Sequence, residues 1–164
     1  MLPVRLSLLD EDKEILLRAR LPGAVRMYTG DDFNYAELIA GDGEHYSDAL
    51  LGIFDPIAPA ASAALAALAE GRTGAFHEIL APTLPLSRHI FKAPTRFYRT
   101  GVVFMASLNG HQDHSVMVGG QESARSLPHL AELFRLADAA GLLRDPELAA
   151  ARMRKVMATH GVEG

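Results

Sequence analysis

Two charged residues interrupt apolar runs, and each could take part in binding a ligand. Arg5 lies in the run 2–9, and Asp48 lies in the run 47–53. An arginine can clamp a carboxylate through its bidentate guanidinium group, although a position without any role is the alternative for Arg5. A buried carboxylate normally needs a partner, and Arg5 is the candidate partner of Asp48. The alternative is that Asp48 lies at the surface.

A second candidate site is the turn Thr29-Gly30-Asp31-Asp32, which follows the apolar run 24–28. Gly30 would let the backbone approach a ligand closely, because it has no side chain. Asp31 or Asp32 could instead cap the helix that follows, since an aspartate accepts hydrogen bonds from the first free N–H groups of a helix. The turn could therefore bind a ligand, cap a helix, or do both.

The segment His111-Gln112-Asp113-His114 contains three potential metal ligands. Imidazole and carboxylate groups together suit zinc or another divalent ion. Two histidines three residues apart share a face only in a helix, whereas the neighbouring Gly110 indicates a loop, and no glutamate base stands between them. We therefore expect no metal site here and no cofactor elsewhere in the chain.

The elements that must position these residues are three successive strand-then-helix steps. Hydrophobic periodicity and helix-start signals predict strands at 2–9, 24–28 and 47–53, and helices at 10–20, 33–40 and 56–70. Such alternation favours right-handed βαβ units and a parallel sheet. The fold class expected for residues 1–72 is therefore α/β.

The second half of the chain has a helical pattern throughout. Helices are predicted at 74–80, 84–91, 94–108, 126–140 and 145–158, and the segment 109–120 is the long stretch without periodicity. We expect residues 73–164 to form a helical region that packs on the α/β part, so that the whole chain makes one compact unit.

Composition excludes several classes of partner and chemistry. The 164 residues are 49% hydrophobic and 22% charged with a net charge of -4, and the cations are scattered, so we expect no nucleic-acid partner. The absence of cysteine excludes disulfides and thiolate chemistry, as suits a cytoplasmic protein. The apolar stretch 57–68 contains Pro59 and is shorter than the ~20 residues a bilayer requires, so no membrane association is expected. The N-terminus does not have the pattern of a signal peptide.

Several of these segments occur in the order found in one enzyme superfamily. The segments VRLSLLD (4–10), YTGDD (28–32), SDALLGI (47–53) and LPLSRHIF (84–91) together resemble the dihydrodipicolinate synthase superfamily. Further segments, DDFNY (31–35), NGHQDH (109–114) and VGG (118–120), resemble a branch of it that is known as a domain of unknown function. The resemblance covers nearly the whole chain.

This resemblance implies part of a (β/α)8 TIM barrel followed by a C-terminal helical extension. Strands six, seven and eight of the barrel would be residues 3–8, 24–28 and 47–53, and the first five strands would be missing. Because side chains from alternate strands around the whole ring fill such a barrel, three strands cannot close it. The piece would expose strand edges.

Members of the superfamily are class I aldolase-type lyases, in which a lysine at the end of strand six forms a Schiff base with a 2-oxo acid. Arg5 occupies the position of that lysine. A guanidinium group keeps its proton and offers no amine lone pair, so no Schiff base can form at this position. The lysines at 13, 92 and 155 are not predicted at the carboxyl end of a strand, so no other residue replaces the catalytic one.

The resemblance also implies a substrate pocket built from the residues singled out above, namely Arg5, Thr29, Gly30, Asp31, Asp32 and Asp48. We expect a protein of the lyase family that is truncated and inactive alone. Its ligand would be a small 2-oxo acid if the missing strands were supplied. The alternatives are a non-catalytic module for oligomerisation or for binding small carboxylates, and a gene fragment without function. The partner would be a second copy of the chain or a complementing half-barrel.

Overall fold

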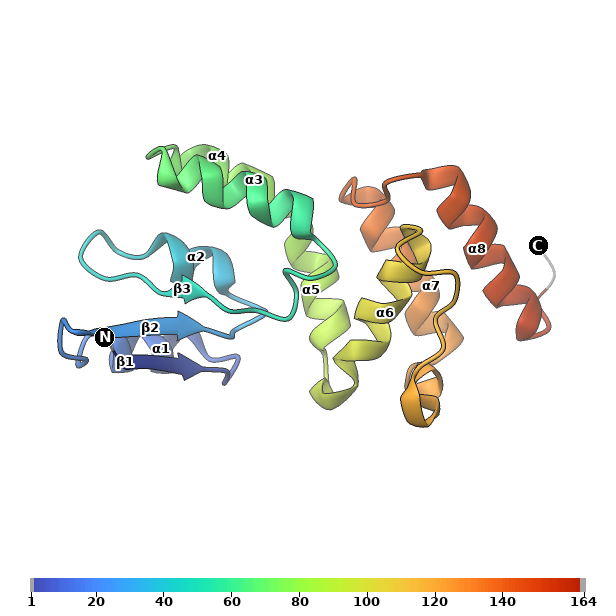
Figure 1. The fold of residues 1–164 in the computed structure, drawn as a ribbon, viewed down its shortest axis with the longest axis horizontal. Helices are drawn as coiled ribbons and strands as arrows, with labels where there is room; N and C mark the ends of the chain where they lie inside the picture. The colour runs from blue at the N-terminus through green and yellow to red at the C-terminus, as the bar shows by residue number, and fades with distance from the viewer. Residues whose placement is uncertain (1, 163–164) are drawn as a thin grey trace. The chain divides into compact units, whose positions relative to one another are not determined.

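The computed structural model describes residues 2–162 of the chain. They fall into two units, Met1–Leu84 and Pro85–Gly164, and Figure 1 shows that strands occur only in the first. The expected boundary lay after residue 72. The observed one lies later because helix α4 (Thr73–Leu80) packs against α3 (Ala58–Ala69) within the first unit. The packing of the helical region on the sheet stays a prediction.

The first unit is α/β, as predicted, and contains a parallel sheet. The strands are β1 (Leu2–Leu6), β2 (Val25–Thr29) and β3 (Asp48–Ala49), with helices α1 (Glu11–Arg18) and α2 (Tyr35–Ala40) between them. Their order in the sheet is β1-β2-β3, and both pairs are parallel. Each strand therefore lies beside the next one in sequence, so the carboxyl ends of all three meet at one edge.

Two strands are shorter than the apolar runs suggested. β1 ends at Leu6, and Leu9 adopts the left-handed conformation with φ 51, which turns the chain into α1. β3 covers two residues of the expected seven. After the N–H of Leu50 has bonded the Thr29 carbonyl, the N–H of Ile53 donates to the carboxylate of Asp32 at 2.7 Å. The Asp32 carboxylate thus takes the place of a backbone acceptor on β2, and the chain leaves the sheet after Ala49.

A buried polar network fastens α1 to the rest of the first unit. Glu14 is 1% exposed and accepts hydrogen bonds from the hydroxyls of Thr29 at 3.0 Å and Ser47 at 2.7 Å. Arg18, one helical turn later, donates to the carbonyl of Leu38 at 2.9 Å. Burial raises the pKa of Glu14, and the two hydroxyls oppose that shift. Since buried polar groups need partners, these contacts fix the position of α1 over β2.

The apolar core of the first unit lies between α2, α3 and α4. Tyr35 and Leu38 on α2 and Phe76 and Leu80 on α4 are fully buried, and α3 contributes buried alanines that allow close approach of its neighbours. The hydroxyl of Tyr35 is hydrogen-bonded to that of Thr83 in η1 (Ala81–Thr83). α4 therefore belongs to the core of this unit.

The second unit is helical. Its elements are α5 (Leu84–Phe91), η2 (Thr95–Phe97), α6 (Tyr98–Leu108), η3 (Val118–Ala124), α7 (Leu127–Ala139) and α8 (Pro146–Thr159). Side chains of Ser126 and Asp145 cap α7 and α8 by accepting from the N–H groups of His129 and Leu148. Among the described residues, no helix combines the length and the apolar character needed to cross a membrane.

Two stacked histidines lie in the core of the second unit. The rings of His89 and His129 are 4.1 Å apart between centroids and 19° from parallel, and Nε2 of His89 donates to the His129 carbonyl at 2.9 Å. His129 is 7% exposed, and within the described residues neither of its ring nitrogens has a hydrogen-bond partner. Burial, together with the neighbouring His89, Arg125 and Lys92, lowers its pKa to about 3. This imidazole is neutral in the folded protein.

Candidate functional site

The candidate site lies at the carboxyl end of the parallel sheet, the edge at which open α/β sheets bind ligands. There the side chain of Arg5 passes from β1 across β2. Its Nε and Nη2 both donate to the carbonyl of Leu50, just after β3, at 3.2 Å and 3.1 Å. One guanidinium group therefore connects the two outer strands, and it is exposed to solvent.

Gly30 is the residue that makes this crossing possible. A side chain at this position would collide with the Ser7 hydroxyl, and its Cβ would lie 2.8 Å from Nη2 of Arg5 and 2.9 Å from the Leu6 carbonyl. The N–H of Gly30 also donates to that carbonyl at 2.6 Å. Gly30 therefore continues the β1–β2 pairing while leaving room for the guanidinium group above it. The sequence analysis expected a ligand to approach the backbone at Gly30. In the structure the group that approaches it is the side chain of Arg5.

Asp31 and Asp32 are both buried, and they act in different ways. Asp31 accepts from the N–H groups of Phe33 at 2.8 Å and Asn34 at 3.0 Å, so it holds the turn before α2 and does not cap the helix, whose N-cap residue is Asn34. The helix itself begins at Tyr35. Asp32 holds the segment after β3 through Ile53. Burial raises the pKa of Asp32 to about 6, and the positive charge of Arg5 opposes the shift.

The hypothesis that Arg5 pairs with Asp48 is wrong. Asp48 lies 3.0 Å from Nε of Arg26 and is partly exposed. Arg5, Tyr28 and Asp48 occupy one row across the sheet, so Arg5 and Asp48 are two strands, roughly 10 Å, apart. Arg26 is on the neighbouring strand and reaches Asp48 first. Only the register of the strands could have revealed this pairing.

The sequence-predicted residues do not all meet. Arg5, Gly30 and Asp32 gather at the carboxyl end of the sheet, where Ser7 and Leu50 join them. Thr29 is completely buried, and its hydroxyl points to Glu14 on the helix-covered side. The sequence analysis did not predict that Ser7 lies beside Gly30. The available signal was that Ser7, like Arg5, is a polar residue in the apolar run 2–9.

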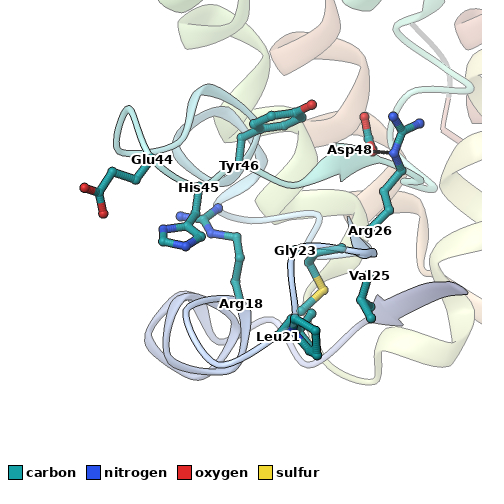
Figure 2. Close-up of a pocket in the computed structure, with 11 residues that line it drawn as sticks. Arg18, Leu21, Gly23, Val25, Arg26, Glu44, His45, Tyr46 and Asp48 are labelled. Carbon is teal, nitrogen blue, oxygen red and sulfur yellow. Dashed lines mark ion pairs between the residues drawn. The ribbon is translucent and has the colours of Figure 1, made fainter. Parts of the chain in front are cut away.

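A pocket of about 310 Å³ lies at the opposite end of the sheet, near the start of β2. Figure 2 shows Leu21 and Val25 on one side of it and His45 and Tyr46 on the other. Its two arginines are already paired, Arg26 with Asp48 and Arg18 with Asp42. Because these charges are compensated within the protein, the pocket offers less to an anionic ligand than the exposed guanidinium of Arg5 does.

The histidine-rich segment of the second unit shows no cluster of metal ligands among the described residues. Among residues 2–162 no three histidine, aspartate or glutamate side chains come together in a way that could hold an ion. His111 and His114 are exposed. Asp113 is also exposed and lies 3.5 Å from Arg152 of α8, so its interaction is with that arginine.

Comparison with known families identifies the chain at the level of family. Residues 2–162 match the family described as "Protein of unknown function (DUF993)". Because the match spans almost the whole sequence, the chain belongs to this family. No curated protein matches it.

Proposed function

We propose that this member of the family binds the carboxylate group of a small 2-oxo acid at the carboxyl end of its sheet, without forming a Schiff base. The observation that carries the proposal is the exposed guanidinium of Arg5 above Gly30. The Leu50 carbonyl uses only Nε and Nη2, so Nη1 can donate to a ligand. Arginine suits this role because its planar donors match a carboxylate.

We further propose that the three strand–helix steps correspond to strands six to eight of a dihydrodipicolinate-synthase-like barrel. The parallel order β1-β2-β3, with a helix after each strand, supports this correspondence. In such a lyase a lysine at the position of Arg5 would bond covalently to the 2-oxo acid. Arg5 keeps the interaction with the carboxylate and removes the covalent step, because a guanidinium cannot attack a carbonyl.

Asp32 adds a pH dependence to the proposed binding. Its carboxyl group lies close enough to influence Arg5 electrostatically, and burial raises its pKa to about 6. Above that pH the carboxylate partly cancels the positive charge that attracts an anion. Below it Asp32 is neutral, so a 2-oxo acid of low pKa should bind more tightly at pH 5.5 than at pH 8.

Titration of the 164-residue chain with pyruvate, followed by amide chemical shifts, tests the proposal. Arg5→Gln should weaken binding at least about tenfold, the equivalent of about 1.4 kcal/mol. Arg26→Gln is the matched control, because Arg26 is a partly exposed arginine on the neighbouring strand that is paired with Asp48. Equal affinity of the wild type and Arg5→Gln for pyruvate would reject the site.

A further inference from the structure

Among residues 2–162, β1 has a strand on one side, β2, and its other edge is open, so its backbone can accept another strand. The N–H of Gly30 donates to the carbonyl of Leu6, which places the backbone groups of the even-numbered residues toward β2. In a strand these directions alternate, so the carbonyl of Pro3 and both backbone groups of Arg5 face outward. Pro3, which has no N–H to donate, is tolerated at such an edge.

The helix beside this edge leaves apolar side chains in solvent. Leu16 on α1 is 55% exposed, and Leu8 in the loop before it is 57% exposed. The buried residues of α1, Glu14 and Arg18, point toward β2 and α2. Leu16 lies on the opposite side of the helix, away from the rest of the unit. The free face of α1 is thus on the same side of the unit as the open edge of β1.

Charge is distributed along this face in a self-complementary way. Asp12, Leu16 and Arg20 follow one another at intervals of four residues and are all exposed. Asp12 and Leu16 lie one turn apart on α1, and Arg20 follows in the turn after the C-cap Ala19. We call these three residues the stripe. Within the described residues neither Asp12 nor Arg20 makes an ion pair. If a second α1 lies antiparallel, Asp12 of each chain meets Arg20 of the other, and the two Leu16 side chains meet in the middle.

We propose that a second copy of this chain docks on this surface, with β1 and α1 of the two chains antiparallel about a twofold axis. The axis passes near Val4, the middle residue of β1, and near Leu16, the middle of the stripe. The N–H of Arg5 in each chain then donates to the carbonyl of Pro3 in the other. Such an isologous contact closes on itself and joins the sheets of two chains into one. It does not depend on the ligand proposed above.

A polypeptide that supplied another strand–helix unit would use the same edge and is the competing occupant. The stripe favours a second copy. Its acid, leucine and base are equally spaced, so an identical stripe running in the opposite direction places each acid beside a base and leucine beside leucine. A strand added in parallel would bring its own helix, and nothing in this stripe would select it.

Exchange of the charges distinguishes the two occupants. Asp12→Arg leaves two arginines at the ends of the stripe, and Arg20→Asp leaves two aspartates, so each variant alone should dimerise at least tenfold more weakly than the wild type in sedimentation equilibrium. An equimolar mixture should form a heterodimer, in which every end pairs an arginine with an aspartate. Glu78→Arg, on the exposed side of α4, is the control for changed net charge and should dimerise like the wild type.

Disulfide formation between single cysteines, one introduced in each chain, tests the position of the axis. The chain has no cysteine, so Leu16→Cys introduces a single thiol that should form an interchain disulfide on mild oxidation. Leu65→Cys, at another exposed leucine on α3, should not. A wild type that stays monomeric at millimolar concentration, equal cross-linking of the two variants, or no heterodimer on mixing would each overturn the proposal. A monomer that gains a partner only when an upstream half-barrel polypeptide is added would assign the edge to that occupant.

Discussion

His129 is a titratable residue that the fold keeps uncharged. Its ring is stacked on His89 and buried without a hydrogen-bond partner for either nitrogen among the described residues. Because the unfolded chain binds a proton near pH 6.5 and the folded one near pH 3, acidification favours the unfolded state. The stabilising contribution is complete above pH 6.5 and is lost progressively as the pH falls toward 3.

Replacement of His129 by phenylalanine should remove this acid sensitivity. Phenylalanine keeps an aromatic ring against His89 and has no proton to bind. Between pH 7.5 and pH 5 the free energy of unfolding should fall by about 2 kcal/mol more in the wild type than in His129→Phe, measured by urea denaturation. His111→Phe, at an exposed position, should behave as the wild type does. An equal fall in the wild type and His129→Phe would contradict the assignment.

At the scale of elements, the arrangement at the carboxyl end of the sheet depends on the absence of a side chain at Gly30, beneath the guanidinium group of Arg5. Gly30→Ala would place a methyl group against Ser7, Arg5 and the backbone of Leu6. We expect a loss of about 1–3 kcal/mol in the free energy of unfolding, as for other overpacked positions. Gly74→Ala is the control, since its Cβ would meet nothing within 4 Å. An alanine in the helix at position 74 should stabilise the protein slightly. Equal stability of the two variants would argue against the passage of the Arg5 side chain over Gly30.

The sequence predicted the order of the elements better than the partners of individual side chains. Strand–helix alternation and the last helix, predicted at 145–158, were visible as local patterns, and the structure confirms them. Glu14 and Arg18 have the spacing of an ordinary solvated helix face, so their burial could not be inferred. The shortness of β3 was equally hidden, because the acceptor that ends it, Asp32, is twenty-one residues away from Ile53.

The candidate site was predicted in part for the same reason. Arg5 was found as a charge within an apolar run, and Gly30 and Asp32 from residue type and from their place after a predicted strand, which are local signals. The choice of Leu50 as the partner of Arg5, and of Arg26 as the partner of Asp48, depends on the register of three strands. A single sequence contains no direct record of that register.

At the scale of the whole molecule, the two units have separate cores, and the candidate site belongs to the first alone. Restoring a lysine in that site should not restore lyase chemistry. In Arg5→Lys the new amine would stand at an exposed position, where only about one lysine in 2,500 is unprotonated at pH 7. Pyruvate and sodium borohydride should leave the intact mass of this variant unchanged, as in the wild type. Stoichiometric labelling at residue 5 would contradict this expectation.

The two-residue length of β3 has a consequence for aggregation. An exposed sheet edge is a template on which further chains can add, and a sheet with two long edges could extend into a fibril. β3 offers only Asp48 and Ala49 to a newcomer, and Asp48 carries a charge paired with Arg26. Growth through this side is therefore disfavoured, and the propagating end that a fibril needs is missing from one edge of the sheet.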